Sequence, residues 1–128
     1  MNLFICLPAV SEKGRRLLES ARLMRPGISV EVFDTRSALV TRLRQPKEDS
    51  LIVVLFDPSH QDLEGLRNAR EFLVGVPLLL VLSDQDAPTM ALAHRLLPTF
   101  ISYVDSDLGQ LFAVIRKLLP ADHEARKA

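Results

Sequence analysis

The sequence predicts an α/β fold, in which a five-stranded parallel sheet carries helices on both faces. Five apolar runs alternate along the chain with five stretches whose apolar residues recur every three or four positions, the period of an amphipathic helix. The connections between these stretches are short, so we expect successive strands to be parallel and joined by right-handed helical crossovers. The runs also differ in polarity, which predicts their places in the sheet.

The strands are expected at Leu3–Leu7, Ile28–Phe33, Leu51–Phe56, Val76–Leu82 and Phe100–Val104. The first, third and fourth runs are apolar throughout, which is typical of central strands that helices cover on both faces. The second alternates apolar with polar residues and the fifth contains Ser102, as edge strands do. A strand order of 2-1-3-4-5 satisfies these preferences.

Each run is followed by a pattern that predicts a helix. The first four patterns are Leu17, Leu18, Ala21 and Met24; Ala38, Leu39 and Leu43, which we expect to face inward; Leu66, Ala69, Phe72 and Leu73, closed by Gly75; and Met90, Ala91, His94 and Leu97. The last helix has the clearest stripe, which comprises Leu108, Leu111, Phe112, Ile115, Leu118 and Leu119.

Length and composition bound the domain organisation and the location. At 128 residues the chain fits one domain, residues 1–121, followed by a charged tail, residues 122–128. The 16 basic and 16 acidic residues balance, which argues against binding to nucleic acid or to a membrane surface. Cys6 lies in the first apolar run and is expected to be a buried, reduced thiol. Because the sequence has no secretory signal pattern and no apolar run of bilayer length, we expect a cytoplasmic protein.

Asp57 marks the place where function is expected. The run Leu51–Phe56 stops at Asp57, which puts this carboxylate at the carboxyl edge of the sheet, where ligands of open α/β sheets usually bind. In the order 2-1-3-4-5, the first and third strands flank the topological switch point, so Asp57 is expected beside Leu7 and Pro8. Asp84 and Asp105 follow the fourth and fifth strands and should emerge at the same edge.

These carboxylates leave two interpretations open. Asp57, Asp84 and Asp105 together would suit a hard cation in a new arrangement. Asp is also the ordinary residue of turns and helix caps, which is the better interpretation: Asp105 and Asp107 precede the last helix, and Asp84 and Asp86 precede the fourth. The histidines, His60, His94 and His123, have no metal-binding spacing and are expected to be exposed to solvent.

The chain resembles the receiver domain of bacterial two-component response regulators, which has a flavodoxin-like fold. The resemblance covers nearly the whole chain and rests on the five β-α units and on the spacing from Asp57 to Gly65. It implies that Asp57 occupies the phosphoacceptor position. It also implies that Ser83 and Tyr103 occupy the two switch positions, at which receivers keep a Ser or Thr and an aromatic residue.

Two departures from the receiver pattern point to a pseudo-receiver. Receivers follow the first strand with an acidic pair that helps to hold Mg²⁺, whereas residues 7–10 here read Leu-Pro-Ala-Val. The nearest acidic residue, Glu12, is expected in the first turn of the following helix, where negative charge suits the helix dipole. Receivers also place a Lys after the fifth strand, and Asp105 replaces it here. A phosphoryl group beside Asp105 would be opposed by that charge.

We therefore expect a stand-alone signalling domain that acts by protein–protein interaction, with no catalytic residue, no metal and no cofactor. Its partner would be a protein such as a kinase or an output protein, and the apolar last helix permits a homodimer without requiring one. In receivers the fourth helix, fifth strand and fifth helix commonly form the docking surface, which here implies Ala91, His94, Arg95, Tyr103 and Phe112. The alternative is a working phosphorelay response regulator, in which a partner histidine kinase phosphorylates Asp57 and Mg²⁺ is bound.

Overall fold

A parallel β-sheet organises the chain. The computed structural model describes residues 1–8, 11–24, 28–46 and 50–119. The strands lie in the order β2-β1-β3-β4-β5 and pair in parallel, which confirms the predicted fold class and strand order. Their bounds are β1 (Asn2–Cys6), β2 (Ser29–Phe33), β3 (Leu51–Phe56), β4 (Leu78–Leu82) and β5 (Phe100–Tyr103).

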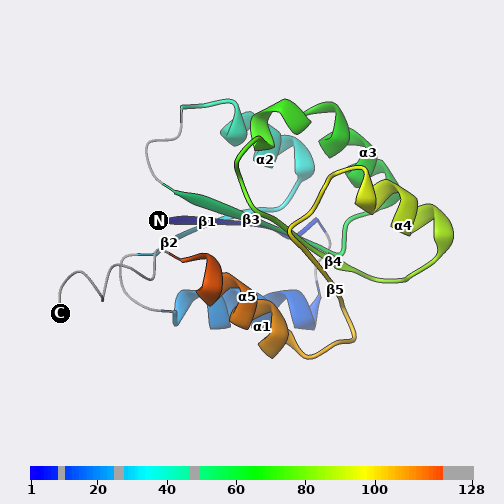
Figure 1. The fold of residues 1–128 in the computed structure, drawn as a ribbon. Coiled ribbons are helices and arrows are strands. Elements are labelled where there is room, and N and C mark those ends of the chain that lie inside the picture. Colours follow the sequence, from blue (N-terminus) through cyan, green and yellow to red (C-terminus); the bar gives the residue numbers. More distant parts are fainter. Residues whose placement is uncertain (9–10, 25–27, 47–49, 120–128) are drawn as a thin grey trace.

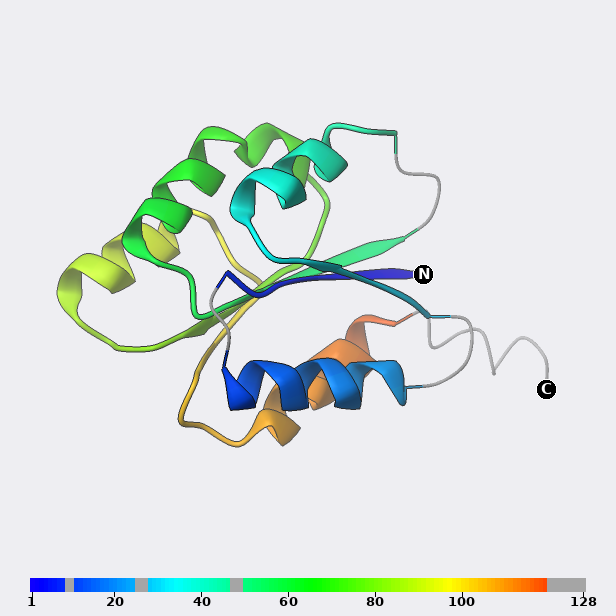
Figure 2. The same cartoon turned by 180° about the vertical axis from the view of Figure 1, so that it is seen from behind.

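The helices form one layer on each face of this sheet (Figures 1 and 2). On one face lie α1 (Glu12–Arg22) and α5 (Leu108–Leu118). On the other face lie α2 (Arg36–Leu43), α3 (His60–Asn68) and α4 (Ala87–His94), together with the short 3-10 helix η1 (Arg70–Leu73). This arrangement gives a three-layer α/β/α fold.

Strand β3 is the centre of the core. All six of its residues are buried, and they alternate between two apolar clusters, one under each helix layer. Val53 and Leu55 belong to the cluster under α2, α3 and α4, and Val54 and Phe56 belong to the one under α1 and α5. Because both faces of the strand are covered, every position has to be apolar, which is why this run was easy to recognise.

The second helix differs from the sequence pattern in burial, and the third differs in extent. In α2, Leu39 and Leu43 are buried as expected, but Ala38 is exposed; it lies in the first turn, and its amide donates to the capping hydroxyl of Thr35. The third pattern is divided between α3 and η1, because α3 ends at Asn68 and the chain tightens into a 3-10 turn before Gly75.

The fourth helical pattern marks the buried face of α4 only in part. Met90 packs half-buried against the core, but the fully buried side chains of this segment are Thr89, Ala93 and Leu96, and Leu97 is 72% exposed. The helix ends at His94, and Leu97 has a left-handed backbone with φ of 52°, so the helical period does not continue through that residue. Phe112, which was expected on the docking surface, is also buried, in the cluster under α1 and α5.

Candidate functional site

Asp57 lies in a cavity at the carboxyl edge of the sheet. Its amide donates to the carbonyl of Val81 over 2.7 Å, which fixes the end of β3 against β4. Its half-buried side chain lines a cavity of about 420 Å³ that we call the Asp57 cavity. The cavity is lined by Pro8, Asp34, Thr35, Arg36, Ser37, Asp57, Ser59 and Asp62. The expected proximity of Asp57 and Pro8 at the switch point is therefore confirmed.

The backbone of Asp57 is strained. Its φ is 54°, a left-handed conformation that disfavours residues with a Cβ, although Asp tolerates it better than most. The next residue is Pro58, which restricts its predecessor further and favours an extended backbone. Strain of this kind is commonly held at functional sites, where the surrounding structure fixes it.

Arg36 brings a cation into the Asp57 cavity, and the sequence pattern gave no indication of this residue. Its Nε lies 3.6 Å from Oδ1 of Asp62, and within the described residues this buried nitrogen has no hydrogen bond. The guanidinium packs directly over Gly65 of α3, in the space that a Cβ at that position would occupy. Gly65 could have indicated this contact, because glycine destabilises the interior of a helix and is usually placed there to let another group approach closely. Here that group is the guanidinium of Arg36.

Cys6 is buried at the end of β1. Burial raises the pKa of its thiol to about 12, and the nearby carboxylates of Asp62 and Asp34 act in the same direction. The side chain is fully buried and is a free thiol, as expected. A thiol held in its neutral form in this way is a structural residue and a poor nucleophile.

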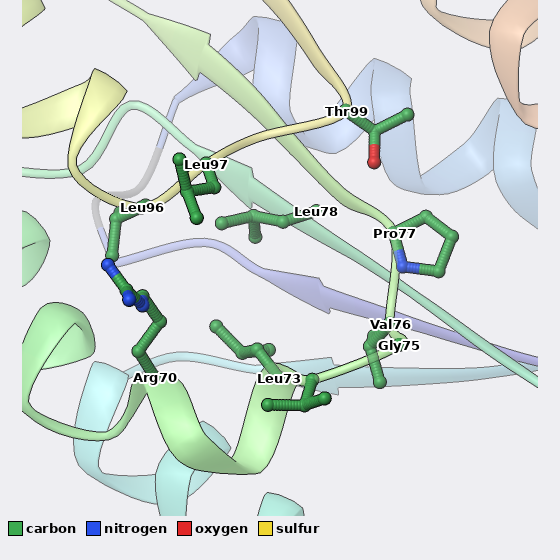
Figure 3. Close-up of a pocket in the computed structure, with 10 residues that line it drawn as sticks. Arg70, Leu73, Gly75, Val76, Pro77, Leu78, Leu96, Leu97 and Thr99 are labelled. Atoms are coloured by element: carbon green, nitrogen blue, oxygen red, sulfur yellow. The ribbon is translucent and has the colours of Figure 1, made fainter.

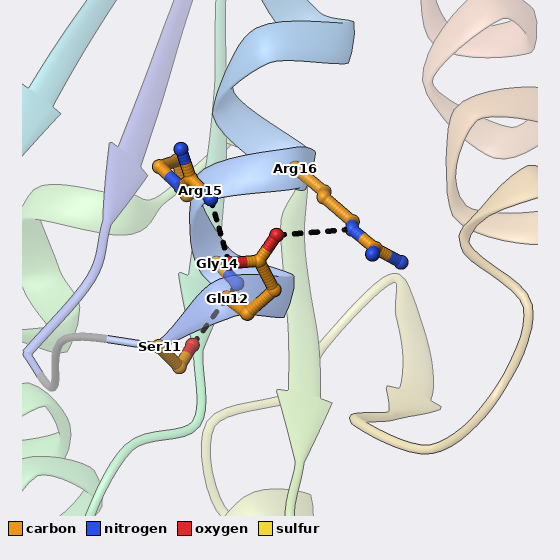
Figure 4. A network of polar contacts seen from close by, with 5 residues as sticks. All are labelled: Ser11, Glu12, Gly14, Arg15 and Arg16. Carbon is orange, nitrogen blue, oxygen red and sulfur yellow. Dashed lines mark hydrogen bonds and ion pairs between the residues drawn. The ribbon is translucent and has the colours of Figure 1, made fainter.

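The start of α1 contains Glu12, the acidic residue nearest in the sequence to the end of β1. Ser11 Oγ accepts a hydrogen bond from the Gly14 amide over 3.0 Å and caps the helix (Figure 4). The Glu12 carboxylate binds Arg15 at 2.6 Å and Arg16 at 3.4 Å, and the hydrogen bond and charge of Arg15 lower its pKa. Glu12 thus belongs to the first helical turn, as expected, and its charge is already paired.

Asp84 organises the turn that leads into α4. Its carboxylate accepts a hydrogen bond from the Asp86 amide over 2.9 Å, and this bond, with another from Thr89, lowers its pKa. Thr89 is buried and also contacts His60, with 2.7 Å between Oγ1 and Nε2. The exposed His60 therefore links α3 to α4, a contact that the sequence did not indicate. Ser83, for which the receiver resemblance implies a switch role, is exposed.

The end of β5 carries Tyr103 and Asp105, for which the receiver resemblance implies the roles of a switch residue and of a replaced lysine. Tyr103 is half-buried, and its hydroxyl lies 3.9 Å from Sδ of Met90 on α4. Asp105 is exposed, whereas Asp107 caps α5 by accepting a hydrogen bond from the Gly109 amide over 2.9 Å. Lys13 of α1, on the same face of the sheet as α5, donates from Nζ to the Val104 carbonyl over 2.7 Å. An ammonium group is thus held at the end of β5, one residue before Asp105.

Asp57, Asp84 and Asp105 do not form a metal-binding group. In residues 1–8, 11–24, 28–46 and 50–119, no three His, Cys, Asp or Glu side chains are grouped so that they would hold a metal ion. Asp57, Asp84 and Asp105 therefore do not form the rebuilt metal site that the sequence left open, and Asp84 serves the local turn instead. His94 is exposed, and His123 and the charged tail lie outside the described residues.

Comparison with known proteins returned no match to any family model, any curated protein or any solved structure. Among the described residues, none of the helices combines the length and apolar character that crossing a lipid bilayer requires.

Proposed function

We propose that this chain is a receiver-like domain that acts by binding another protein, in the cytoplasm, without Mg²⁺-dependent phosphorylation of Asp57. The observation that carries the proposal is the charge of the Asp57 cavity. Three carboxylates line it, those of Asp34, Asp57 and Asp62, and the one cation among the described lining residues, Arg36, faces Asp62.

This charge distribution disfavours an aspartyl phosphate. A phosphoryl group adds about 1.5 to 2 negative charges near neutral pH and needs cations to hold it. The described residues contain no group of carboxylates suited to holding a metal ion, so the added charge would meet two further carboxylates without Mg²⁺ to offset them. Arg36 would have to leave Asp62 to neutralise it. A switch requires different contacts in its two states, so a phosphorylated state without a cation of its own has little to stabilise it.

A second candidate, a phosphoacceptor switch, is favoured by Lys13. Its ammonium group is held at the end of β5 by the Val104 carbonyl, one residue before Asp105. In this alternative, Lys13 would exchange the carbonyl for a phosphoryl oxygen and so replace the missing lysine from another element. The two candidates therefore differ in what they require of Lys13 and Asp57.

Amide NMR titration with Mg²⁺ and then with beryllofluoride, which mimics an aspartyl phosphate in receivers, separates the two candidates. For the interaction module we expect the resonances of Asp57, Ser83 and Tyr103 to stay unmoved at millimolar Mg²⁺. Shifts at Asp57 that spread to Tyr103, and that disappear in both Asp57→Asn and Lys13→Met, would overturn the proposal in favour of the switch. Lys117→Met, on the exposed side of α5, is the matched control for loss of one lysine.

In cells, the same proposal predicts that Asp57→Asn leaves the function of the protein unaltered. The substitution removes the acceptor carboxylate, while Asn tolerates the left-handed backbone at this position. A loss of function in a variant that remains folded would show that the carboxylate itself is needed, and would count against a phosphorylation-independent module.

A further inference from the structure

We propose that an apolar groove at the amino-terminal edge of the sheet receives a segment of a partner protein that carries apolar side chains next to an acidic one. This inference rests on the proposed function, since it names the docking surface of an interaction module. The groove lies at the edge opposite the Asp57 cavity, because it includes the start of β4 whereas Asp57 follows the end of β3. It also differs from the surface that the receiver resemblance implied.

The groove has a volume of about 470 Å³, within the range of sites that bind ligands. Segments around η1, the start of β4 and the turn from α4 to β5 form its walls (Figure 3). The lining residues are Arg70, Leu73, Val74, Gly75, Val76, Pro77, Leu78, Leu96, Leu97 and Thr99. Most of this lining is apolar, so an occupant must bring apolar groups to displace water from it.

Two apolar side chains of the groove are exposed to a degree that packing within the chain does not explain. Val74 is 82% exposed and Leu97 is 72% exposed. In the described part of the chain, the other large apolar side chains that are exposed are Leu23 and Val32, and neither lines this groove. Val74 and Leu97 come from the two separate turns that border the groove, so an inserted segment would contact both.

Leu97 is also strained. Its φ of 52° is a conformation in which helices usually place Gly or Asn after their last turn, and the following Pro98 disfavours it further. A leucine at this position stabilises the isolated chain neither by burial nor by backbone preference. Strained residues cluster at ligand-binding sites, and contact with an apolar segment would give this side chain the burial that it lacks.

The charge of the groove specifies the acidic part of the occupant. Arg70 is the one charged residue among the described residues that line it, and its guanidinium is held in place by a hydrogen bond of 2.9 Å from Nη1 to the Arg95 carbonyl. The remaining N–H groups of a guanidinium suit a carboxylate, which they bind in a bidentate manner. A positive charge beside an apolar floor thus matches an apolar segment with an Asp or Glu side chain.

Selection from a library of random peptides displayed on phage, with the purified chain as bait, tests this assignment. We expect the enriched peptides to combine apolar residues with Asp or Glu, and a synthetic copy to shift the amide resonances of Leu73, Val74 and Leu97. Its affinity should fall at least tenfold for Leu97→Gly and for Arg70→Glu. Arg67→Glu, an exposed arginine of α3 that does not line the groove, should bind like the parent.

Leu97→Gly separates binding from folding, because glycine relieves the left-handed strain. We expect its urea midpoint to be at least that of the parent while its peptide affinity falls.

Absence of enrichment, enrichment without acidic residues, or unchanged binding by Leu97→Gly would overturn the assignment. If sedimentation experiments show that the parent self-associates and that Leu97→Gly does not, the groove binds a second copy of the chain, and the proposed partner protein is wrong. If beryllofluoride shifts the resonance of Asp57 while the peptide still binds, the proposed function is contradicted but the assignment of the groove as a docking site is not.

Discussion

Asp57 is the residue at which backbone strain and candidate function coincide. Because its φ is 54°, a Cβ is unfavourable there, and we expect Asp57→Gly to be more stable than Asp57→Ala by about 1 kcal/mol. Urea unfolding of the two variants measures this difference. Ser29, an exposed position in β2, is the control, since Gly should be less stable than Ala in an ordinary strand. If the Ala variant is more stable than the Gly variant at residue 57 as well as at residue 29, the backbone of Asp57 is not strained.

Cys6 gives the protein a specific sensitivity to alkaline pH. The pKa of its thiol is about 12 in the folded chain and 9.0 ordinarily, so the folded state keeps a proton that the unfolded state releases. A raised pKa of this kind stabilises the fold fully below pH 9.0, and the contribution is lost as the pH rises toward 12. The free energy of unfolding should therefore fall over that window by up to about 1.4 kcal/mol per pH unit.

Cys6→Ala provides the comparison, because the variant lacks the titrating thiol. Its free energy of unfolding will be lower at neutral pH, since a buried side chain has been shortened. Its slope against pH above 9.0 should nevertheless be shallower than that of the parent, by the contribution of one thiol. Parallel slopes in the two proteins would mean that Cys6 ionises as easily in the folded chain as in the unfolded one.

At the scale of elements, Gly65 makes room for Arg36 between α2 and α3. A Cβ at residue 65 would occupy the position of the guanidinium, so Gly65→Ala should displace Arg36 from Asp62 and cost about 1 kcal/mol. In an Arg36→Ala background the same substitution should stabilise the protein by about 0.5–1 kcal/mol, because alanine is the better helix former. The sign of the effect is expected to reverse between the two backgrounds.

A double-mutant cycle measured by urea unfolding tests this contact. The cycle compares the parent, Gly65→Ala, Arg36→Ala and the double variant. If Gly65→Ala changes the free energy of unfolding equally in both backgrounds, contact with Arg36 is not the reason for a glycine at this position. In that case the spacing from Asp57 to Gly65 would need a different physical explanation.

For the molecule as a whole, the sheet could be predicted from the sequence, whereas the residues that line the cavities could not. Strands β1, β3 and β4 are recognisable because burial on both faces demands unbroken apolar runs, and their order then locates Asp57 beside Pro8. Arg36 and Leu97 were not predictable in the same way. Arg36 enters the Asp57 cavity only because two helices pack closely at Gly65, and the exposure of Leu97 depends on a backbone angle.

Burial on both faces, which made the central strands predictable, should also determine which parts of the chain unfold locally and which unfold only with the whole chain. Amides of β3 bond between two neighbouring strands, and its side chains are buried under both helix layers, so they should exchange only when the whole chain unfolds. Edge strand β2 has no fully buried residue and should exchange through local fraying. Native-state hydrogen exchange is expected to give β1, β3 and β4 opening free energies equal to the value from urea unfolding, and β2 a lower one. Equal protection in β2 would mean that this edge is covered in solution, and Val32, which is 37% exposed, would be the first contact to examine.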